Sequence, residues 1–478
     1  MIARPLAAAF ALAFAALSPP ETARAGPVAM TPALAERIDV AVRASTGNTK
    51  GLAPAVSVAI VEDGTVVYAR AFGTADLAAK TPATPQTRFR IASVTKMFTA
   101  VAVMQQVEHG TVRLDEPLAT YLPKAPHAKD VTIRQLLMHT SGIWNYGDES
   151  FKAGRVTTPV TPSEIIAWTA DRPLEAPPGE KFVYSNTGYV LLGLVVEAVT
   201  HRSLARYEQT NIFDRAGMTE TTFGEVPARV PVATGYMDAG GTPALPYSPS
   251  WFYADGDIVS TAADVARFDA ALMAGRLVKP ETFALMQSSS VIAPLLGPTV
   301  RYGLGVMLLP SRTVTWAGHH GGVPGFVAES EMLPADRIAI VVLADTSAFV
   351  TGNVQRAVQQ LIVPELFAPL PAGPAAAGAD PAVEAKLRAL IDGLQHGTID
   401  RATLDEAMNA AFTPQAVSGA ALQFAPLGAL TTLTFRGKET SHGLDVYHYT
   451  AAFGGGQNLP VTFTIEPKTG KIAGLFFV

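Results

Sequence analysis

Alternating and helical patterns of apolar residues mark out the first elements of the chain. Apolar and polar positions alternate over residues 53–73 on both sides of Asp63-Gly64, a pair that accepts positive φ, which predicts a β-hairpin. Over residues 94–108 apolar positions recur at helical spacing and Gly110 follows them, which predicts a long helix with a left-handed end. Another helix is predicted over residues 190–199.

A loop-rich middle section separates these elements from a second group of predicted strands. Pro and Gly are frequent up to about residue 300, and we expect loops to dominate there. Three later apolar segments favour strands, at residues 314–316, 326–332 and 338–343. The sequence shows no repeat with a period of roughly 20–50 residues, which argues against a solenoid or a propeller.

A change of pattern near residue 371 predicts a second domain. Residues 371–381 are rich in Pro, Gly and Ala without apolar periodicity, as is typical of a linker. Residues 383–394 then predict a helix, and a second short helix is expected near 403–411. Three alternating segments follow, at about 429–436, 443–453 and 460–478. We therefore expect a small α+β accessory domain over residues 382–478, loosely similar to cystatin-like or nuclear-transport-factor-like folds.

The first 25 residues have the pattern of a secretory signal. A basic Arg4 precedes an apolar run over residues 6–17, and Ala23-Arg24-Ala25 precedes Gly26. The run is shorter than the ~20 residues that span a bilayer. We expect the signal to be cleaved, which would leave a periplasmic or secreted protein without a stable membrane anchor. Retention of the segment as an anchor remains the alternative.

Composition excludes several classes of protein. The 478 residues are 48% hydrophobic and 16% charged, with a formal net charge of −5, so neither a disordered polymer nor a basic nucleic-acid-binding surface is predicted. Because the chain has no Cys, it has neither disulfides nor a cysteine-linked lipid. We expect a small molecule or a peptide as its partner, and the sequence leaves the oligomeric state open.

The first candidate for chemistry is Ser93-Val94-Thr95-Lys96, at the start of the helix predicted over residues 94–108. A serine and a lysine three positions apart lie on the same face of a helix. A serine hydroxyl becomes a good nucleophile when a base removes its proton, and the free N–H groups at a helix start can stabilise an oxyanion. Taken alone, the motif is also typical of a helix cap with a solvated lysine.

Two further motifs could complete such a site. In Tyr184-Ser185-Asn186, the phenol can pass protons and the amide can orient a lysine amine and a substrate carbonyl, although such a tripeptide also occurs in ordinary turns. Gly318-His319-His320-Gly321-Gly322 follows the predicted strand ending at Trp316, and its glycines would let a substrate approach the backbone. A metal site made by the paired histidines is disfavoured, because adjacent residues of a strand face opposite sides.

In this order and spacing, the three motifs resemble those of the serine hydrolases that include class C β-lactamases, D-alanyl-D-alanine carboxypeptidases and β-lactamase-like esterases. Four other stretches are similar to elements of that family, at residues 137–143, 178–193, 256–262 and 302–305. The resemblance covers about residues 30–365. It implies an α/β (α+β) fold, with an antiparallel sheet flanked by helices and a helical subdomain, within a domain that we place at residues 26–370.

The resemblance also implies roles for the residues that match the motifs. These are Ser93, Lys96 and Tyr184 for catalysis, Asn186, His319 and Gly321 for substrate binding, and the backbone N–H groups of Ser93 and Gly322 for the oxyanion hole. Ser93 would be acylated, while Lys96 and Tyr184 would share the base and acid roles. By the same resemblance His139 belongs to a loop that lines the cleft. No metal and no cofactor is implied.

One departure from the family bears on the substrate. Class C β-lactamases place a lysine where this chain has His319, and an imidazole with an ordinary pKa of ~6.5 attracts a carboxylate only when protonated. Efficient β-lactam hydrolysis is therefore disfavoured. The sequence favours an exported serine hydrolase of small esters or amides. The alternatives are a D-alanyl peptidase acting on cell-wall peptides, a weak β-lactamase, and a non-catalytic protein that binds a peptide or acyl ligand.

Overall fold

The computed structural model describes most of the chain. The described residues are 29–47, 54–147, 150, 154–224, 226, 230–238, 240–293, 295–296, 300–311, 314–349, 351–366, 376–412, 417–418, 420–421, 424, 427–441, 444–455 and 458–477. The predicted signal segment and the first five residues of the predicted linker lie outside them. Within the described residues, no helix is both long enough and apolar enough to cross a membrane.

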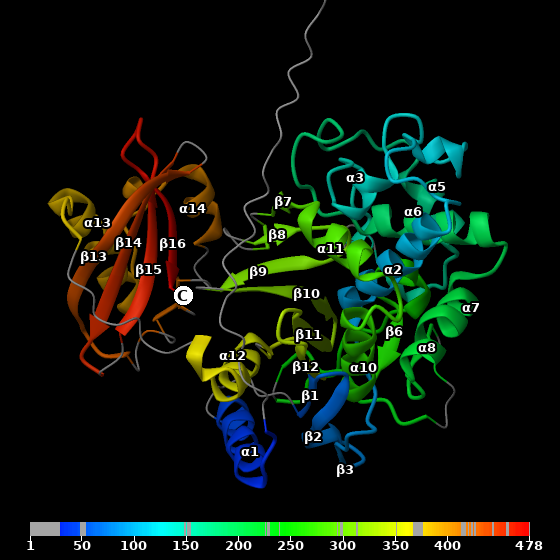
Figure 1. The fold of residues 1–478 in the computed structure, drawn as a ribbon, viewed down its shortest axis with the longest axis horizontal. Helices are drawn as coiled ribbons and strands as arrows, with labels where there is room; N and C mark the ends of the chain where they lie inside the picture. The colour runs from blue at the N-terminus through cyan, green and yellow to red at the C-terminus, as the bar shows by residue number, and fades with distance from the viewer. Residues whose placement is uncertain are drawn as a thin grey trace, which may run out of the picture.

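A nine-stranded antiparallel sheet forms the centre of the larger part of the molecule (Figure 1). In spatial order its strands are β3 (Thr81–Pro82), β2 (Thr65–Asp76), β1 (Ala55–Glu62), β12 (Ile338–Ala344), β11 (Phe326–Leu333), β10 (Val314–Val323), β9 (Met307–Ser311), β8 (Arg301–Tyr302) and β7 (Val291–Ile292). A small three-stranded sheet lies in the order β4 (Phe89–Arg90), β6 (Ile258–Ser260) and β5 (Thr222–Phe223).

Helices cover both faces of the large sheet, as the alternation along β1 requires. Val56, Val58 and Ile60 face one apolar cluster, which α1 (Pro32–Gly47) and α12 (Thr351–Ile362) complete. Ala55, Ala59 and Val61 face the other, larger cluster. The helices of that cluster's side are α2 (Thr95–Glu108), α3 (Ile133–Leu137), α5 (Pro162–Thr169), α6 (Asn186–Thr200), α7 (Leu204–Glu208), α8 (Asp214–Ala216), α9 (Tyr253–Gly256), α10 (Ala262–Met273) and α11 (Pro280–Ser288).

The carboxyl-terminal residues form a four-stranded antiparallel sheet with helices and an apolar cluster of its own (Figure 1). Its elements are α13 (Pro381–Gln395), α14 (Glu406–Ala411), β13 (Leu430–Ser441), β14 (Leu444–Phe453), β15 (Asn458–Ile465) and β16 (Ile472–Phe477). The last predicted segment is thus two strands, which turn near Gly470, where φ is +66°.

The sequence patterns locate several elements correctly. β1 and β2 form the predicted hairpin, in which Asp63 and Gly64 have φ of +46° and +82°. The helix predicted over residues 94–108 is α2, and Gly110 follows it with φ of +75°. The fold class expected from the family resemblance, a large antiparallel sheet flanked by helices with an additional carboxyl-terminal sheet, is confirmed.

Two expected boundaries need correction. The middle section is rich in loops, as expected, and it also holds short helices such as α10 that the sequence patterns did not locate. Helix α6 begins at Asn186, four residues before the predicted start, because Ser185 caps it by accepting a hydrogen bond from the Gly188 N–H. Strand β10 continues through its glycines and histidines, which pair with β11 up to Val323.

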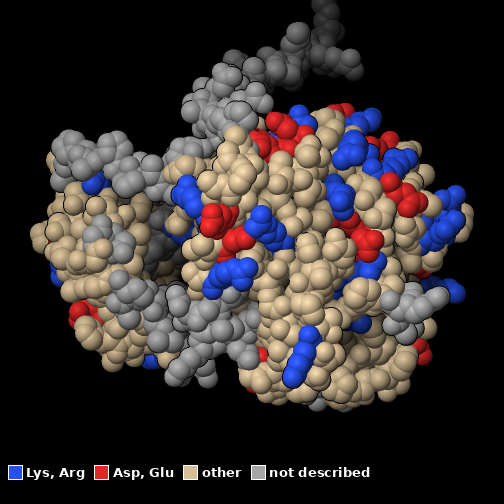
Figure 2. Space-filling view, turned by 90° about the horizontal axis from the view of Figure 1, so that it is seen from below, with Lys and Arg blue, Asp and Glu red and all other residues tan. Residues whose placement is uncertain are grey.

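The surface charges are mixed. On the face shown in Figure 2, Lys and Arg side chains lie among Asp and Glu side chains. That face therefore carries no continuous area of one sign.

Candidate active site

Ser93 lies in a short 3₁₀ turn, Ala92–Val94, directly before α2. Ala92 has a φ of +48°, a conformation that is rare for residues with a side chain and that costs free energy unless its surroundings enforce it. One helical turn later, the Lys96 ammonium donates a hydrogen bond to Ser93 Oγ at 3.1 Å. The structure therefore brings together the nucleophile and the base that the first motif predicts.

Lys96 is held by three further contacts in the interior. Its side chain is 0% exposed. Nζ donates hydrogen bonds to Asn186 Oδ1 and to the backbone carbonyl of Asp255, each at 2.8 Å. The Asp255 carboxylate lies 3.9 Å from Nζ. The ammonium thus joins α2, the first residue of α6, and α9, and its position next to Ser93 is fixed.

Asp255 is a component that the motifs did not predict. Its carboxylate is buried and accepts a hydrogen bond from the Tyr146 hydroxyl at 2.9 Å. Burial raises the pKa of Asp255 to about 7, although Lys96 and the Tyr146 hydrogen bond act in the opposite direction. The stretch similar to the family begins one residue later, at Gly256, so the sequence carried no signal for this carboxylate.

Tyr184 lies beside Lys96 within a group of aromatic rings. The Lys96 nitrogen is 5.0 Å from the centre of the Tyr184 ring. The His139 ring lies 4.2 Å from that ring, and His139 Nδ1 accepts a hydrogen bond from the Ser185 N–H at 3.1 Å. The His139 side chain is fully buried and packs against the Tyr184 ring, so it supports that ring from within the loop that is expected to line the cleft.

His319 is also buried, which changes its expected role. Its Nε2 lies 2.9 Å from the Tyr302 hydroxyl, and its Nδ1 lies 2.6 Å from the backbone carbonyl of His320. A carbonyl only accepts hydrogen bonds, so we assign the ring proton to Nδ1 and a hydrogen bond from Tyr302 to Nε2. Burial, with the charge of Lys96, lowers the pKa of His319 to about 3.

The burial of His319 therefore disfavours the hypothesis that its side chain titrates near the ordinary pKa and binds a substrate carboxylate. At neutral pH this imidazole carries no charge, and both of its nitrogens are engaged within the chain. It cannot attract a substrate carboxylate as an imidazolium. In the structure, His319 accepts a hydrogen bond from the Tyr302 hydroxyl. That hydroxyl also lies 3.3 Å from the hydroxyl of Tyr189.

The two glycines of the third motif have different surroundings. A Cβ at Gly321 would lie 2.4 Å from the Ile91 carbonyl oxygen and 2.9 Å from the Ser93 nitrogen. The sequence suggested that this glycine lets a substrate approach the backbone. In the structure, the absence of a side chain at Gly321 instead makes room for the chain's own turn at Ser93. A Cβ at Gly322 would meet no atom within 4 Å. The amides of Ser93 and Gly322 thus belong to adjoining segments, as the predicted oxyanion hole requires.

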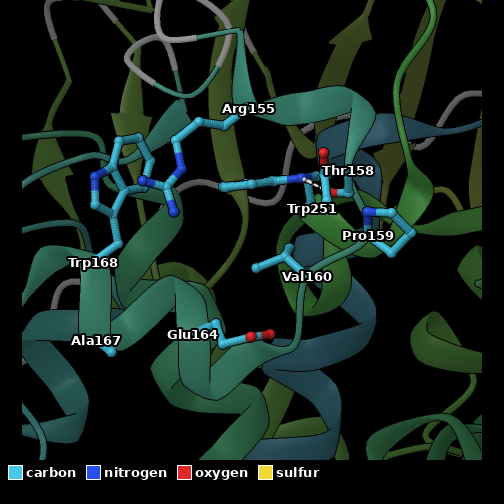
Figure 3. A pocket seen from close by; sticks show the side chains of 8 residues that line it. All are labelled: Arg155, Thr158, Pro159, Val160, Glu164, Ala167, Trp168 and Trp251. Carbon is cyan, nitrogen blue, oxygen red and sulfur yellow. Dashed lines mark hydrogen bonds between the residues drawn. The ribbon is translucent and has the colours of Figure 1, made fainter.

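A cavity of about 500 Å³ lies on the helical side of the molecule. It is lined by Arg155, Thr158, Pro159, Val160, Glu164, Ala167, Trp168 and Trp251 (Figure 3). The Arg155 guanidinium lies over the Trp168 ring at 4.6 Å, and the Trp251 indole donates a hydrogen bond to the Thr158 carbonyl at 2.7 Å. Because the Tyr146 hydroxyl lies close to both the Trp251 carbonyl and the Asp255 carboxylate, this wall is connected to the surroundings of Lys96.

Residues 40–363 match the family model described as Beta-lactamase. The chain belongs to the beta-lactamase family. Among curated relatives, penicillin-binding protein 4* of Bacillus subtilis (strain 168) is 30% identical over 295 residues, which cover 56% of this chain and 63% of that protein. Protein flp of Staphylococcus aureus (strain COL) is 31% identical over 202 residues, which cover 41% of this chain and 40% of that protein. The chain thus spans less than two thirds of these relatives' own lengths.

Solved structures that are similar to this chain include an amidase and a penicillin-binding protein homologue. The D-amino acid amidase from Ochrobactrum anthropi SV3, complexed with L-phenylalanine amide, is 27% identical, with a TM-score of 0.60 over 70% of this chain and 97% of its own. The octameric penicillin-binding protein homologue from Pyrococcus abyssi is 25% identical with a TM-score of 0.61, over 94% of this chain and 99% of its own. The latter match extends beyond the residues that the family model covers.

Proposed function

We propose that this protein is an exported hydrolase that cleaves small esters or amides through an acyl-Ser93 intermediate. The observation that carries the proposal is the buried Lys96 ammonium, 3.1 Å from Ser93 Oγ and oriented by Asn186 and Asp255. A site that only bound a ligand would have no need for a lysine held against a serine in the interior. Membership of the beta-lactamase family supports the same chemistry.

In the proposed reaction, Ser93 Oγ attacks the carbonyl carbon of the substrate while its proton passes to whichever member of the Lys96–Tyr184 pair is deprotonated, the Lys96 amine or the Tyr184 phenolate. The N–H groups of Ser93 and Gly322 stabilise the oxyanion. As the bond to the leaving group breaks, the proton passes to the leaving alcohol or amine. Water then attacks the acyl-enzyme, with Lys96 and Tyr184 taking its proton and returning one to Ser93, and the acid is released.

Neutral substrates are favoured over carboxylates at the third motif. Where class C β-lactamases have a lysine, this chain has an uncharged, buried His319. A substrate carboxylate would therefore gain no charge–charge attraction there. The similarity to a D-amino acid amidase supports amides as substrates. D-alanyl peptides remain a second candidate, which the penicillin-binding relatives favour.

Covalent labelling tests the proposed nucleophile. Intact-mass spectrometry after treatment with a fluorophosphonate should show one adduct on the wild-type chain and none on Ser93→Ala. Ser141→Ala, which alters a serine of the neighbouring loop, is the matched control and should still be labelled. Labelling that persists in Ser93→Ala would contradict the assignment.

A panel of substrates tests the proposed specificity. Release should be fastest from p-nitrophenyl esters or from amino-acid amides, slower from D-alanyl peptides and slowest from a chromogenic cephalosporin. A cephalosporin hydrolysed as fast as the esters would contradict the proposed substrate class.

Export has a separate test. Protein recovered from the periplasm or the medium should begin near Gly26, whereas full-length protein in the membrane would indicate the anchor alternative.

A further inference from the structure

His320, Glu329 and Glu331 form a cluster on the side of the sheet opposite to His319. Strands β10 and β11 place His320 directly opposite Glu329, and Glu331 lies two residues further along β11, on the same face. His320 Nε2 lies 3.1 Å from Glu329 Oε1 and 3.2 Å from Glu331 Oε1. Thus the three side chains meet at one point, although they come from two strands and share no sequence motif.

The separations between these atoms suit a bound cation. Zinc binds imidazole nitrogen and carboxylate oxygen at roughly 2.0–2.2 Å, so two ligands of a tetrahedral site lie about 3.4 Å apart. One ligand atom from each of the three side chains can be chosen so that all lie within 4.8 Å of one another. Small rotations of the side chains would therefore suffice to place all three around one ion.

Amide groups from a neighbouring helix hold one of the carboxylates. Gln359 donates a hydrogen bond to Glu331 Oε2 at 2.7 Å, and Gln355 donates to the same oxygen at 3.4 Å. Both glutamines lie on α12 and are buried. The two glutamines bind Oε2 of Glu331, so the other carboxylate oxygen, Oε1, is left to contact His320. Hydrogen bonds of this kind orient the ligands in established metal sites.

The cluster also has an entrance. A hollow of about 450 Å³ is lined by His320, Gly321, Gly322, Val327, Ala328, Glu329, Phe349, Thr351 and Gly352. The His320 side chain is 42% exposed, whereas those of Glu329 and Glu331 are 5% and 9% exposed. An ion could therefore reach the cluster from the hollow and keep a position open toward it, as zinc with three protein ligands does.

The cluster places two little-exposed carboxylates next to each other. The Glu329 and Glu331 side chains are 5% and 9% exposed, and both lie within 3.2 Å of His320 Nε2. A divalent ion bound between them would compensate the charge of both carboxylates.

We propose that His320, Glu329 and Glu331 bind one divalent transition-metal ion, with Zn²⁺ the best fit to one imidazole and two carboxylates. The fourth position of the ion faces the hollow beside Gly321 and Gly322. His320 lies on the face of the sheet opposite to His319, although the hollow also borders Gly322, whose N–H is proposed for the oxyanion hole. The inference does not rest on the proposed hydrolase activity.

Calorimetry of the full chain tests the proposal. After dialysis against a chelator and removal of the chelator, titration with Zn²⁺ should show about one ion per chain, and the measured enthalpy should change between buffers of different protonation enthalpy because protons are released. Glu331→Gln and His320→Ala should each weaken binding by at least about 10-fold. His396→Ala is the matched control, because it removes an exposed histidine that also lies near a carboxylate, and it should bind as the wild type does.

Wild-type protein that binds Zn²⁺ no more tightly than about 100 μM, or no more tightly than Glu331→Gln does, would overturn the site. If Glu331→Gln does not fold, His320→Ala decides the question, since its side chain is half-exposed. Fluorophosphonate labelling of Ser93 should persist in the chelated protein, because the proposed acyl chemistry needs no metal. A failure of labelling and a failure of metal binding are therefore distinguishable.

Discussion

Asp255 touches Lys96 through two different groups. Its backbone carbonyl accepts a hydrogen bond from Lys96 Nζ at 2.8 Å, and its carboxylate lies 3.9 Å from the same nitrogen. The carbonyl holds the amine at any pH, whereas the carboxylate changes its charge with pH. Because burial raises the pKa of Asp255 to about 7, this change falls in the neutral range.

Replacing Asp255 by Asn should alter the pH dependence of turnover. In the wild type, kcat/KM for a neutral ester should show an inflection near pH 7, because the carboxylate of Asp255, 3.9 Å from Lys96 Nζ, changes its charge there. Asp255→Asn keeps a group that can accept the Tyr146 hydrogen bond and should remove the inflection. Asp269→Asn is the control, since Asp269 is a buried carboxylate bound to Ser330. An inflection that survives in Asp255→Asn would contradict this coupling.

The same substitution should change the pH dependence of folding stability. The folded state binds the Asp255 proton more tightly than the unfolded chain, in which the pKa lies near 3.8. The stability that comes from this group is therefore complete below about pH 4 and is lost as the pH rises through about 7. Urea denaturation at pH 5 and pH 8 should show a smaller loss of stability on raising the pH for Asp255→Asn than for the wild type. Equal losses would contradict the raised pKa.

Buried His319 predicts parallel pH profiles for two kinds of substrate. With a pKa of about 3, the imidazole stays neutral from pH 5 to pH 8. The ratio of kcat/KM for a carboxylate-bearing D-alanyl peptide to that for a neutral ester should therefore stay constant within about twofold over this range. A ratio that falls through an inflection near pH 6–7 would show that His319 titrates and binds the carboxylate.

Gly321 and Gly322 provide a matched pair for testing the contact between β10 and the Ser93 turn. Gly321→Ala should lower stability by about 1–3 kcal/mol, as overpacking does, and should reduce turnover because the added Cβ meets Ile91 and Ser93. Gly322→Ala adds the same group in open space and should leave stability nearly unchanged. Denaturant unfolding and steady-state kinetics measure both. Similar losses of stability in the two variants would contradict the packing explanation.

Removal of the carboxyl-terminal residues tests whether they are accessory. The four-stranded sheet and its helices pack around an apolar cluster of their own, and the site residues Ser93, Lys96, Tyr184, Asn186 and His319 all lie earlier in the chain. A chain ending at Ala372 should therefore fold and retain most of its turnover of small esters. A folded but inactive product would show that the carboxyl-terminal residues complete the site.

Much of the fold could be predicted because local patterns specify it. The β1–β2 hairpin follows from alternation around a turn with positive φ, and α13 follows from five apolar residues at helical spacing that are all buried. Helix α10 has a local signal that the sequence analysis did not use, since Thr261 caps it by accepting a hydrogen bond from the Asp264 N–H. The extension of β10 depends on its pairing with β11. Ser93 and Lys96 could be paired from their spacing within a single helical turn.

The surroundings of the site were less predictable than its motifs. Asp255 is 159 residues from Lys96 along the chain, and nothing in a single sequence indicates that they meet. The shift in the pKa of His319 likewise arises from burial, which the motif cannot reveal. The sequence shows which side chains could react. Their protonation states depend on burial and on neighbouring groups, which only the tertiary structure reveals.

Alternate residues of strand β10 contact opposite faces of the sheet. This alternation limits which mutations the segment can accept. His319 contacts Tyr302 on the side of the nucleophile, and His320 contacts Glu329 on the other side. Point substitutions between positions 318 and 322 alter one environment at a time. A codon inserted or deleted there would exchange the two faces for every residue beyond it and would remove Gly321 from Ser93. Divergence in this segment should therefore proceed by substitution at constant length.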